Sequence, residues 1–365
     1  MAAPSPRTVQ ERLLRWFDAT KRDLPWRRTK DPYRILVAEY LLQRTRVVSG
    51  APYYERFLER FPDLRSLAEA STDEVLRAWE GLGFYGRARK LHAAARTIAK
   101  DHGGIVPSDV KALRSLSGVG PYTAGAVASI AFGERIPAVD GNASRVLARL
   151  FRMKEDMTRN PGRARLWALA ETLVPPSRPG AFNQALMELG ATVCTPTSPR
   201  CEICPLADVC LARGAGVQTS LPTRPRPRRA PTARVAFGMI ESEGRVLLVR
   251  RPDRGLLAGL WSLPGGEVRD TADLREGLRA LIYAQTGLRV RIGEKAAPIA
   301  HAFSHRRWTG AIYRCDGEPT PIPSPTARWV DPEDARRLPL VSFQRKALES
   351  LRGRKTPRPP PSSPR

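Results

Sequence analysis

Apolar side chains in residues 8–212 recur every three or four positions, which is the spacing of helices that bury one face. This pattern predicts an amphipathic helix over residues 8–20. Residues 33–47 are apolar on almost every side, which predicts a buried helix. A helix of small residues, which can pack closely, is expected over 123–132. Together these segments predict an all-α domain over residues 8–212.

The pattern changes after residues 213–233, which are rich in proline and arginine and predict an extended linker. Short apolar runs then predict strands, and an amphipathic run predicts a helix; these elements are expected over 233–240, 245–251 and 271–286. Residues 234–351 are therefore expected to form an α+β domain. The basic, proline-rich residues 352–365 predict a disordered tail.

Composition indicates the partner and the compartment. The chain of 365 residues carries a formal net charge of +25, which points to a polyanion such as nucleic acid. No apolar run approaches the roughly 20 residues that span a bilayer, and the first residues lack the apolar core of a secretory signal. We expect an intracellular, cytoplasmic, nucleoid-associated monomer without membrane contact.

A glycine-rich turn, Gly118-Val119-Gly120, separates two predicted helices. Glycine allows backbone angles closed to other residues, and it leaves N–H groups at the start of the next helix open to an anion. The turn would suit a DNA phosphate, although a helix–turn–helix corner without a ligand explains the same residues. Further along, Asp140 and Asn142 lie at a new helix start. Asp140 is there either as an N-cap or as an acid held at a reacting centre.

Glu39 is the acidic residue inside the buried helix predicted over 33–47. Burial raises the pKa of a carboxylic acid, which suits a general acid that works near neutral pH. A place on the exposed edge of a half-buried helix would instead leave Glu39 an ordinary surface residue. Periodicity alone does not separate these two interpretations.

Four cysteines with the spacing C-x6-C-x2-C-x5-C end the predicted helical domain: Cys194, Cys201, Cys204 and Cys210. Four thiols in one short segment of an intracellular chain indicate metal binding rather than disulfides. Zinc sites usually pair two C-x2-C elements. This segment has one such element, so a single compact iron–sulfur cluster is favoured over a zinc knuckle.

Aromatic and basic side chains also meet on a glycine-rich segment, residues 79–89. The candidates there are Leu82, Phe84, Tyr85 and Arg87. Aromatic rings can enter between DNA bases, and arginines can hold phosphates. The alternative is an aromatic plug of the core beside solvated arginines.

These motifs resemble those of the helix-hairpin-helix-Gly/Pro-Asp superfamily of base-excision glycosylases, which includes endonuclease III and the MutY-type adenine glycosylases. The segment LVAEYLLQRTRV is similar to the MutY segment that carries the catalytic acid, here Glu39. The resemblance implies a [4Fe–4S] cluster in the cysteine loop. It also implies roles for further residues: Asp140, Tyr122 and Asn142 at the catalytic centre, and Trp26, Arg27 and Gln184 in an adenine pocket.

The same resemblance implies DNA contacts from Gly118, Gly120, the segment with Phe84, and the residues Gln43, Arg44 and Thr45. Two positions depart from the family pattern. Phe84 stands where the family has a tyrosine wedge, so the ring is kept and the hydroxyl is lost. Arg44 stands where the family has a glutamine, and an arginine could stack and pair with guanine edges.

Position 122 indicates the type of reaction. In endonuclease III, a lysine two residues after the second glycine of the hairpin forms a Schiff base with the sugar. Tyr122 occupies that position here and offers no amine. The resemblance therefore implies a monofunctional glycosylase.

Residues 234–351 resemble a Nudix fold that lacks its catalytic acids. The positions expected to carry Mg²⁺-binding carboxylates hold Ala272, Leu281, Ala284 and Gln285. The domain is expected not to hydrolyse nucleotides and, like the MutY C-terminal domain, to recognise 8-oxoguanine. Phe303, Ser304 and His305 match the lesion-contact loop of that domain, although a turn that merely caps strands would look the same.

The sequence thus predicts a base-excision repair enzyme that removes adenine mispaired with 8-oxoguanine, and more weakly with guanine, from double-stranded DNA. A mismatch thymine or uracil glycosylase, a nucleotide-pool Nudix hydrolase and a non-catalytic lesion-binding protein remain as alternatives.

Overall fold

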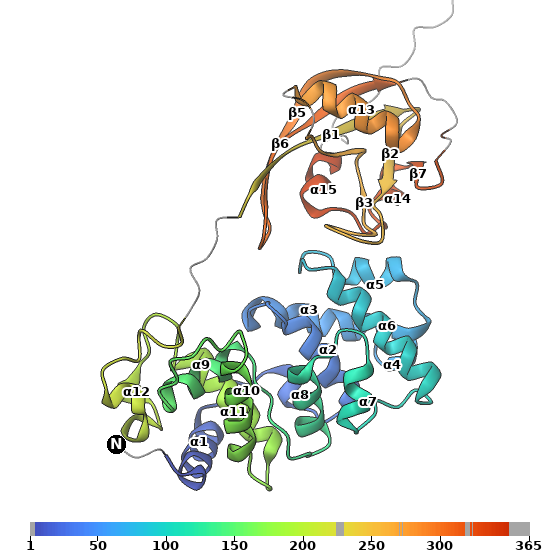
Figure 1. The fold of residues 1–365 in the computed structure, drawn as a ribbon. Helices are drawn as coiled ribbons and strands as arrows, with labels where there is room; N and C mark the ends of the chain where they lie inside the picture. The colour runs from blue at the N-terminus through green and yellow to red at the C-terminus, as the bar shows by residue number, and fades with distance from the viewer. Residues whose placement is uncertain are drawn as a thin grey trace, which may run out of the picture. The chain divides into compact units, whose positions relative to one another are not determined.

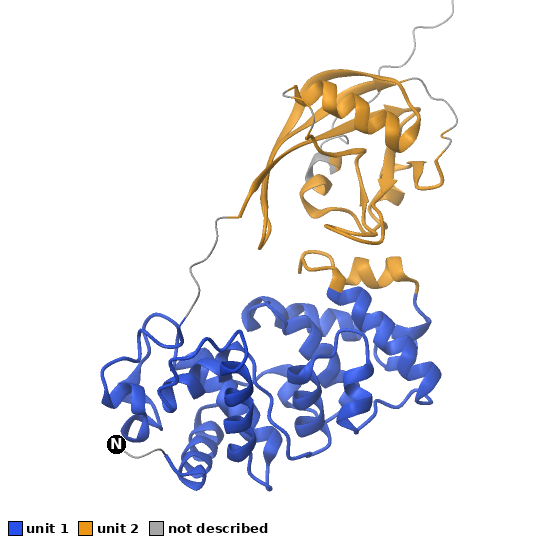
Figure 2. Cartoon of the chain, in the orientation of Figure 1, with its two compact units in different colours: residues 1–70, 87–227 blue, residues 71–86, 228–365 orange. Residues whose placement is uncertain are grey.

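The computed structural model describes residues 4–223, 230–269, 271, 273–317, 322 and 324–349. The predicted tail, residues 352–365, lies outside these residues, as does Ala272. The chain forms two compact units (Figures 1 and 2). Unit 1 comprises Met1–Ala70 and Arg87–Pro227, and unit 2 comprises Ser71–Gly86 and Arg228–Arg365. The short segment Ser71–Gly86 thus groups with unit 2, although the sequence places it within the helical domain.

Unit 1 is helical, as the sequence predicted. Its helices are α1 (Pro6–Thr20), α2 (Pro32–Leu42), α3 (Val47–Arg60), α4 (Leu64–Glu69), α6 (Gly86–Asp101), α7 (Val110–Ser115), α8 (Pro121–Ala131), α9 (Gly141–Leu150), α10 (Gly162–Leu173), α11 (Pro179–Thr192) and α12 (Leu211–Gly214), with the short 3-10 helices η1 (Pro25–Arg27), η2 (Cys201–Ile203) and η3 (Ala207–Val209). Local sequence explains the start of α2, because Asp31 accepts a hydrogen bond from Arg34 N and Pro32 occupies the first turn.

The buried helix predicted over 33–47 ends earlier, at Leu42. Arg44 adopts a left-handed backbone conformation, with φ at 59°, which a helix cannot include. Arg87 of α6 satisfies the exposed carbonyl groups at this end, because its Nη1 donates to the carbonyl oxygens of Tyr40, Leu41 and Gln43. The chain then turns and restarts as α3.

The small residues of α8 let it lie very close to the segment that precedes α9. A Cβ atom on Gly125 would lie 2.1 Å from the carbonyl oxygen of Pro137, so no other residue fits there without a backbone shift. Asn183 of α11 holds the same segment. Its Oδ1 accepts from Ala138 N at 3.1 Å, and its Nδ2 donates to the Ile136 carbonyl at 2.8 Å. The start of α9 is thereby fixed from two sides.

The first part of the predicted linker packs on unit 1 and is not an extended spacer. Leu221 is buried, and its carbonyl oxygen accepts a hydrogen bond of 2.9 Å from Arg149 Nε. Thr223 Oγ1 donates to the Lys154 carbonyl at 3.1 Å. The buried Arg149 guanidinium requires acceptors, and this backbone supplies one. Residues 224–229 lie outside the described part of the chain.

Unit 2 contains a seven-stranded sheet with the order β3-β2-β1-β6-β5, to which β4 adds beside β1 and β7 beside β2. The strands are β1 (Thr232–Ser242), β2 (Arg245–Arg250), β3 (Trp261–Ser262), β4 (Gly265–Glu267), β5 (Val290–Ala302), β6 (Arg307–Gly317) and β7 (Ala327–Val330); the helices are α5 (Thr72–Ala78), α13 (Leu274–Thr286), α14 (Pro332–Ala335) and α15 (Ser342–Glu349). β1 and β6 are parallel, whereas the remaining pairs are antiparallel.

Alternate residues of β1 enter two separate apolar clusters. Phe237 packs in the cluster that includes Leu348 of α15, whereas Ala236 packs in the cluster that includes Ile282 of α13. Side chains of a strand point to opposite faces in turn, so both faces of the sheet are covered by helices. The α+β fold is confirmed, and the helix predicted over 271–286 is present as α13, which begins three residues later, at Leu274.

Candidate active site

Several parts of unit 1 that lie far apart in the sequence line one cavity of about 140 Å³. The contributing elements are η1, α2, α8, the start of α9, and α11. The cavity brings together the predicted catalytic and adenine-pocket residues: Glu39, Tyr122, Asp140, Asn142, Trp26, Arg27 and Gln184.

Glu39 lies on the buried face of α2 and is 7% exposed. Its Oε2 has no hydrogen-bond partner among the described residues. Burial raises the pKa of Glu39 to about 7; the charge of Asp140 adds to the shift, and hydrogen bonding to Tyr122 opposes it. A protonated carboxyl group whose second oxygen has no partner among the described residues can donate a proton to a molecule bound in the cavity.

Asp140 both caps a helix and faces the cavity, so its two interpretations are compatible. Its Oδ1 accepts from Ala143 N at 2.7 Å, which caps α9, and its Oδ2 accepts from Asn142 Nδ2 at 2.9 Å. Burial raises the pKa of Asp140 above its ordinary value, and these hydrogen bonds reduce the shift without reversing it. Hydrogen-bond donors at a helix N-terminus favour the ionised form, so the two carboxyl groups have different surroundings.

Asn142 and Tyr122 are each held by a second side chain. Arg145 Nη2 donates to Asn142 Oδ1 at 2.8 Å, which orients the amide so that its Nδ2 faces Asp140. The Tyr122 hydroxyl lies 3.3 Å from Met187 Sδ. The residues described as lining this cavity include no lysine.

Glu188 is a site residue that the sequence analysis missed. It is 2% exposed, lines the cavity and accepts hydrogen bonds from Arg22 Nε and Nη2 at 2.7 Å and from Arg27 Nη2 at 2.8 Å. Burial would raise the pKa of Glu188, but the two arginines lower it to about 2. A signal was present, because Glu188 follows Gln184 by four residues and so shares its helix face.

The structure corrects the role predicted for Arg87. We expected its guanidinium to hold a phosphate, but Arg87 is 8% exposed and its Nη1 is used by α2 carbonyl groups and by Thr45 Oγ1 at 3.1 Å. Arg87 therefore positions the turn that carries Gln43, Arg44 and Thr45. Within this turn, Gln43 Nε2 donates to Thr123 Oγ1 at 3.3 Å, Thr45 lines the cavity, and Arg44 is exposed.

The aromatic pair of the predicted wedge divides into one exposed and one buried ring. Phe84 is 44% exposed and has a positive φ of 48°, whereas Tyr85 is 5% exposed. The Tyr85 hydroxyl accepts from Gly81 N at 3.4 Å. Tyr85 therefore supports the segment from within, and Phe84 remains the candidate wedge, with Leu82 half-buried beside it in the sequence.

The two glycines of the hairpin turn differ in their geometry. Gly118 has a φ of +83°, and a Cβ there would lie 2.9 Å from Lys90 Cβ. Gly120 has a φ of −91° and open space around it, so it does not need the special angles that we expected. It is the N-cap of α8 without a side-chain cap. The first N–H groups of α8 therefore receive no side-chain hydrogen bond from the cap residue.

The four cysteines of the loop all line a small cavity of about 30 Å³, and none forms a disulfide. Burial raises the pKa of the Cys204 thiol to about 12. Arg149, 1% exposed, donates to Cys194 Sγ at 3.3 Å, so a buried cation lies beside the thiol group. This donor set fits a metal cluster, because thiolates are the ligands of iron–sulfur centres and a neighbouring cation stabilises their charge.

In unit 2, the predicted lesion-contact residues lie in the turn between β5 and β6. Phe303 is half-buried, and its ring centroid lies 5.1 Å from that of Trp308, so it anchors the turn. Ser304 and His305 are exposed, with Ser304 Oγ 3.5 Å from His305 Nδ1. These two side chains, rather than Phe303, are available to a ligand.

Comparisons with known proteins match both units. Residues 37–172 match the HhH-GPD superfamily of base excision DNA repair proteins, residues 194–210 match the iron–sulfur binding domain of endonuclease III, and residues 235–350 match the NUDIX domain. The chain is 36% identical to an adenine DNA glycosylase of Rattus norvegicus, over 92% of this chain and 76% of that protein. The chain belongs to the adenine DNA glycosylase family.

Other relatives support the family assignment. An adenine DNA glycosylase of Mycolicibacterium smegmatis is 43% identical over 62% of this chain and 77% of its own length. A solved thermostable thymine-DNA glycosylase matches 57% of this chain and 97% of its own, with a TM-score of 0.53 and 33% identity. The predicted helix-hairpin-helix glycosylase fold, the Nudix-like second domain and the iron–sulfur cofactor are confirmed, and the iron–sulfur match spans all four cysteines. No helix among the described residues is long and apolar enough to cross a membrane.

Proposed function

We propose that this glycosylase removes adenine paired with 8-oxoguanine, and more weakly adenine paired with guanine, from double-stranded DNA. The reaction is hydrolysis of the N-glycosidic bond without cleavage of the strand. The observation that carries the proposal is the pair of carboxyl groups, Glu39 and Asp140, that line one cavity in different surroundings. Two carboxyl groups with different protonation states are the usual means of breaking a glycosidic bond.

In the proposed reaction, the adenine leaves the base stack and enters the cavity. Glu39 donates its proton to a ring nitrogen, and the bond between the base and the sugar breaks with its electron pair on the base. Asp140, ionised, stabilises the positive charge that develops on the sugar. Water then adds to the sugar carbon and gives a proton to the Glu39 carboxylate, which restores the acid. Asn142, fixed by Arg145, keeps Asp140 in place.

The adenine pocket is formed by Trp26, Arg27, Gln184 and Glu188. Glu188 holds Arg27 in a defined direction, so the guanidinium is oriented before the base enters. Trp26 packs edge-on against Tyr54, with ring centroids 5.5 Å apart, which limits the rotation of its indole. Rigid polar groups around a flat apolar wall suit a purine.

The absence of lyase activity follows from the chemistry of the lining. A lyase needs an amine that attacks the sugar, and the described lining of the cavity has the phenol of Tyr122 and no lysine. The product is then an abasic site in an intact strand.

DNA recognition is proposed for groups of each unit that are exposed or half-buried. In unit 1 these are the start of α8 behind Gly118 and Gly120, and the turn with Arg44. In unit 2 they are Phe84 as the wedge, and Ser304 and His305 as contacts to 8-oxoguanine. Cys194, Cys201, Cys204 and Cys210 would hold the cluster, which when bound cross-links their loop. We propose a monomer that works on intracellular DNA.

The test is single-turnover excision on a duplex with one adenine:8-oxoguanine pair, analysed with and without alkali. Strand breaks that appear only after alkali are expected. Breaks without alkali would show that an amine elsewhere acts as a lyase, and tight binding without any product would favour a non-catalytic lesion-binding protein.

A mismatch thymine glycosylase is the second candidate, because a solved thymine-DNA glycosylase shares the fold of unit 1 at 33% identity. A duplex with a thymine:guanine pair, run in parallel, separates the two. We expect negligible thymine release, since the pocket is proposed to protonate a purine through Glu39.

A further inference from the structure

The segment Ser71–Gly86, which carries the candidate wedge Phe84, belongs to the same compact unit as the seven-stranded sheet (Figure 2). After α5, this segment continues as a short loop, residues 79–86. Gly81, Gly83 and Phe84 of the loop have positive φ values of 93°, 70° and 48°. A residue with a side chain adopts this conformation at a cost in free energy, so other parts of the fold must stabilise the loop.

Hydrogen bonds within the segment define the shape of this loop. Trp79 is fully buried, and its Nε1 donates to the Gly83 carbonyl at 3.1 Å. The amide groups of Glu80 and Leu82 donate to the carbonyl oxygens of Arg77 and Trp79, at 3.0 and 3.2 Å. These bonds join residues of the segment to one another and do not attach the loop to the rest of unit 2.

Glu80 attaches the loop to α15 through an ion pair with Arg345. Arg345 Nε donates to Glu80 Oε1 at 2.5 Å, and Arg345 Nη2 donates to Glu80 Oε2 at 2.6 Å. The two side chains are 22% and 20% exposed, so water and salt screen the pair only in part. A bidentate arginine–carboxylate pair fixes direction as well as distance. Glu80 lies four residues before Phe84, in the same loop.

The Arg345 side chain is itself held by the backbone that leads into α15. Its Nη1 donates to the Arg336 carbonyl at 3.4 Å, and its Nη2 donates to the Leu338 carbonyl at 3.2 Å. Leu338 packs against the apolar cluster that includes Phe237 and Trp308 of the sheet. One guanidinium group thus connects the acid of the loop to the backbone beside the core of unit 2.

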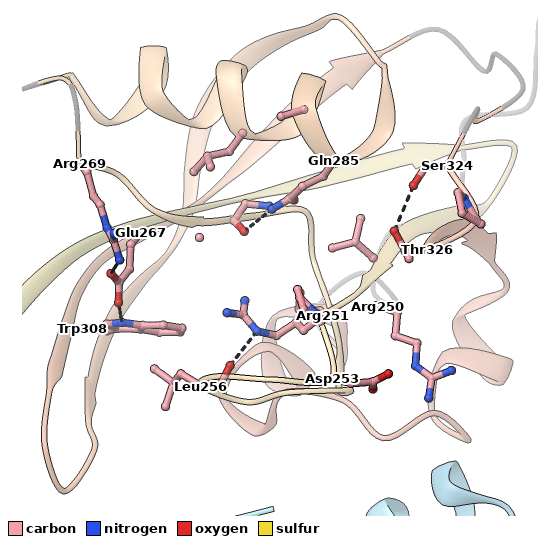
Figure 3. Close-up of a pocket in the computed structure, with 18 of the residues that line it drawn as sticks. Arg250, Arg251, Asp253, Leu256, Glu267, Arg269, Gln285, Trp308, Ser324 and Thr326 are labelled. Carbon is pink, nitrogen blue, oxygen red and sulfur yellow. Dashed lines mark hydrogen bonds and ion pairs between the residues drawn. The ribbon is translucent and has the colours of Figure 1, made fainter. Parts of the chain in front are cut away.

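Two further contacts join α5 to the sheet part of unit 2. Arg250 Nη2, at the end of β2, donates to Asp73 Oδ1 at 3.2 Å, and Arg77 Nη1 donates to the Arg337 carbonyl at 3.2 Å. Figure 3 shows the guanidinium groups of Arg250 and its neighbour Arg251 pointing in opposite directions. The Arg250 and Asp73 side chains are 38% and 34% exposed, so we expect this pair to contribute less than the pair in the loop.

We propose that Glu80 and Arg345 are positioning residues for base excision. Their ion pair holds the loop with Phe84 on the sheet part of unit 2, so that the wedge and the turn with Ser304 and His305 meet the DNA as one unit. Free energy gained when the turn binds 8-oxoguanine is then available to insert the ring of Phe84 between bases. The proposal rests on the function proposed above for Phe84, Ser304 and His305.

The first test measures the attachment of the loop without DNA, by hydrogen exchange and mass spectrometry on the full chain. The amides of Glu80 and Leu82 are hydrogen-bonded within the loop, so their exchange reports its opening. We expect exchange in the loop to be about tenfold faster in Arg345→Met, which loses a charged hydrogen-bonded pair. The control Arg291→Met removes a pair with Asp316 elsewhere on the sheet and should exchange as wild type does. Equal exchange in all three proteins would overturn the proposal.

The second test compares single-turnover excision of adenine opposite 8-oxoguanine and opposite guanine. Only the first duplex engages the lesion contacts. We therefore expect Glu80→Gln and Arg345→Met to lower its rate constant about tenfold and to lower that of the second duplex much less. A general loss of stability would instead lower both rates alike.

The combined variant, Glu80→Gln with Arg345→Met, shows whether the two residues act through each other. It should be no slower than the slower single variant, because either substitution alone removes the pair. Additive losses in the combined variant, or an unchanged preference for 8-oxoguanine in both single variants, contradict the proposal.

A third measurement follows the wedge itself. A fluorescent 2-aminopurine beside the target adenine of an adenine:8-oxoguanine duplex reports unstacking, and Glu39→Gln is the background so that excision does not interfere. We expect the fluorescence to rise on binding, and to rise less when Arg345→Met is added. Equal rises would overturn the positioning role and leave the proposed function intact. A wild-type enzyme without preference for 8-oxoguanine would instead refute the proposed lesion specificity, whatever the hydrogen exchange of the loop.

Discussion

Glu39 and Asp140 face one cavity from two helices, and burial together with the charge of Asp140 raises the pKa of Glu39 to about 7. The ordinary value for a glutamic acid is 4.5. Glu39 thus carries its proton under conditions in which a surface glutamate has lost it. The same residue is predicted to act as the acid in base excision. Excision rates report this catalytic role, and urea unfolding reports the effect of Glu39 on stability.

Glu39→Gln should abolish adenine excision while the affinity for an adenine:8-oxoguanine duplex stays within a few fold of wild type. Glutamine keeps the shape of the side chain and cannot donate an acidic proton. Single-turnover rates and gel-shift affinities measure the two effects. Glu171→Gln, an exposed position of α10, is the control. A mutant rate comparable to wild type would falsify the general-acid role.

The excision rate of the wild type should fall as the pH rises through about 7, because the protonated form of Glu39 is the active one. The rate is measured under single-turnover conditions from pH 5.5 to about 9, with DNA concentration saturating at each pH. A rate that is flat across this range, or that rises with pH, contradicts the assignment.

The raised pKa of Glu39 should also make the free energy of unfolding depend on pH. The folded pKa of Glu39 lies above its unfolded value, so the unfolded chain releases the proton first and stability falls as pH rises from about 4.5 to 7. In Glu39→Gln the side chain does not ionise, so the variant does not lose stability in this way as the pH rises. We expect the variant to be more stable than wild type at pH 8 and to converge with it near pH 4.5, as measured by urea unfolding.

Removing Glu188 should destabilise unit 1. In Glu188→Gln, Arg22 and Arg27 lose a buried carboxylate that holds both. We expect a loss of about 2–3 kcal/mol, at the low end for a buried pair because Arg22 is partly exposed. The pKa of Glu188 is lowered to about 2. The loss should therefore be complete above about pH 4.5 and shrink as the pH falls toward 2.

The control for Glu188 is Glu11→Gln, whose pair with Arg7 lies on the exposed face of α1. It should leave the urea midpoint unchanged. Adenine excision is the second readout, since Arg27 loses its orientation only in Glu188→Gln.

Alanine at the two hairpin glycines should have unequal effects on stability. Gly118→Ala forces a side chain into a positive φ and within 2.9 Å of Lys90 Cβ, and we expect a loss of about 1–3 kcal/mol. Gly120→Ala meets open space at an ordinary φ, and we expect a change within about 0.5 kcal/mol. Equal losses in thermal or urea unfolding would contradict the turn geometry described here.

Replacing one cysteine of the loop should remove the cluster. Cys204→Ser is expected to lose iron and inorganic sulfide, and to lower the melting temperature, because the loop loses its cross-link. Cys315→Ser changes a cysteine buried in unit 2 and should keep the full iron content. Retention of iron in Cys204→Ser would remove this residue from the ligand set.

The sequence was most informative where chemistry depends on residues in one local motif. Glu39 within an apolar helix, Asp140 at a helix start and the four cysteines in one loop could all be recognised without a structure. Asn183 and Arg149 could not, because their importance comes from partners on other parts of the fold. For Glu188 the only sequence signal was the helix face that it shares with Gln184. The same reason explains the error at Arg87. Its neighbours in sequence suggested a phosphate contact, whereas its burial depends on carbonyl groups at the end of α2.

The close approach of α8 to the backbone at Pro137 connects a residue of the helix interior, Gly125, to the position of Asp140. A methyl group at Gly125 would displace the backbone at Pro137, three residues before Asp140. Because Ala138 is held by a hydrogen bond to Asn183, this displacement would be passed on along the chain to Asp140. A substitution in an apolar helix interior, far from any base or sugar, would then both lower the stability of unit 1 and slow excision by displacing Asp140.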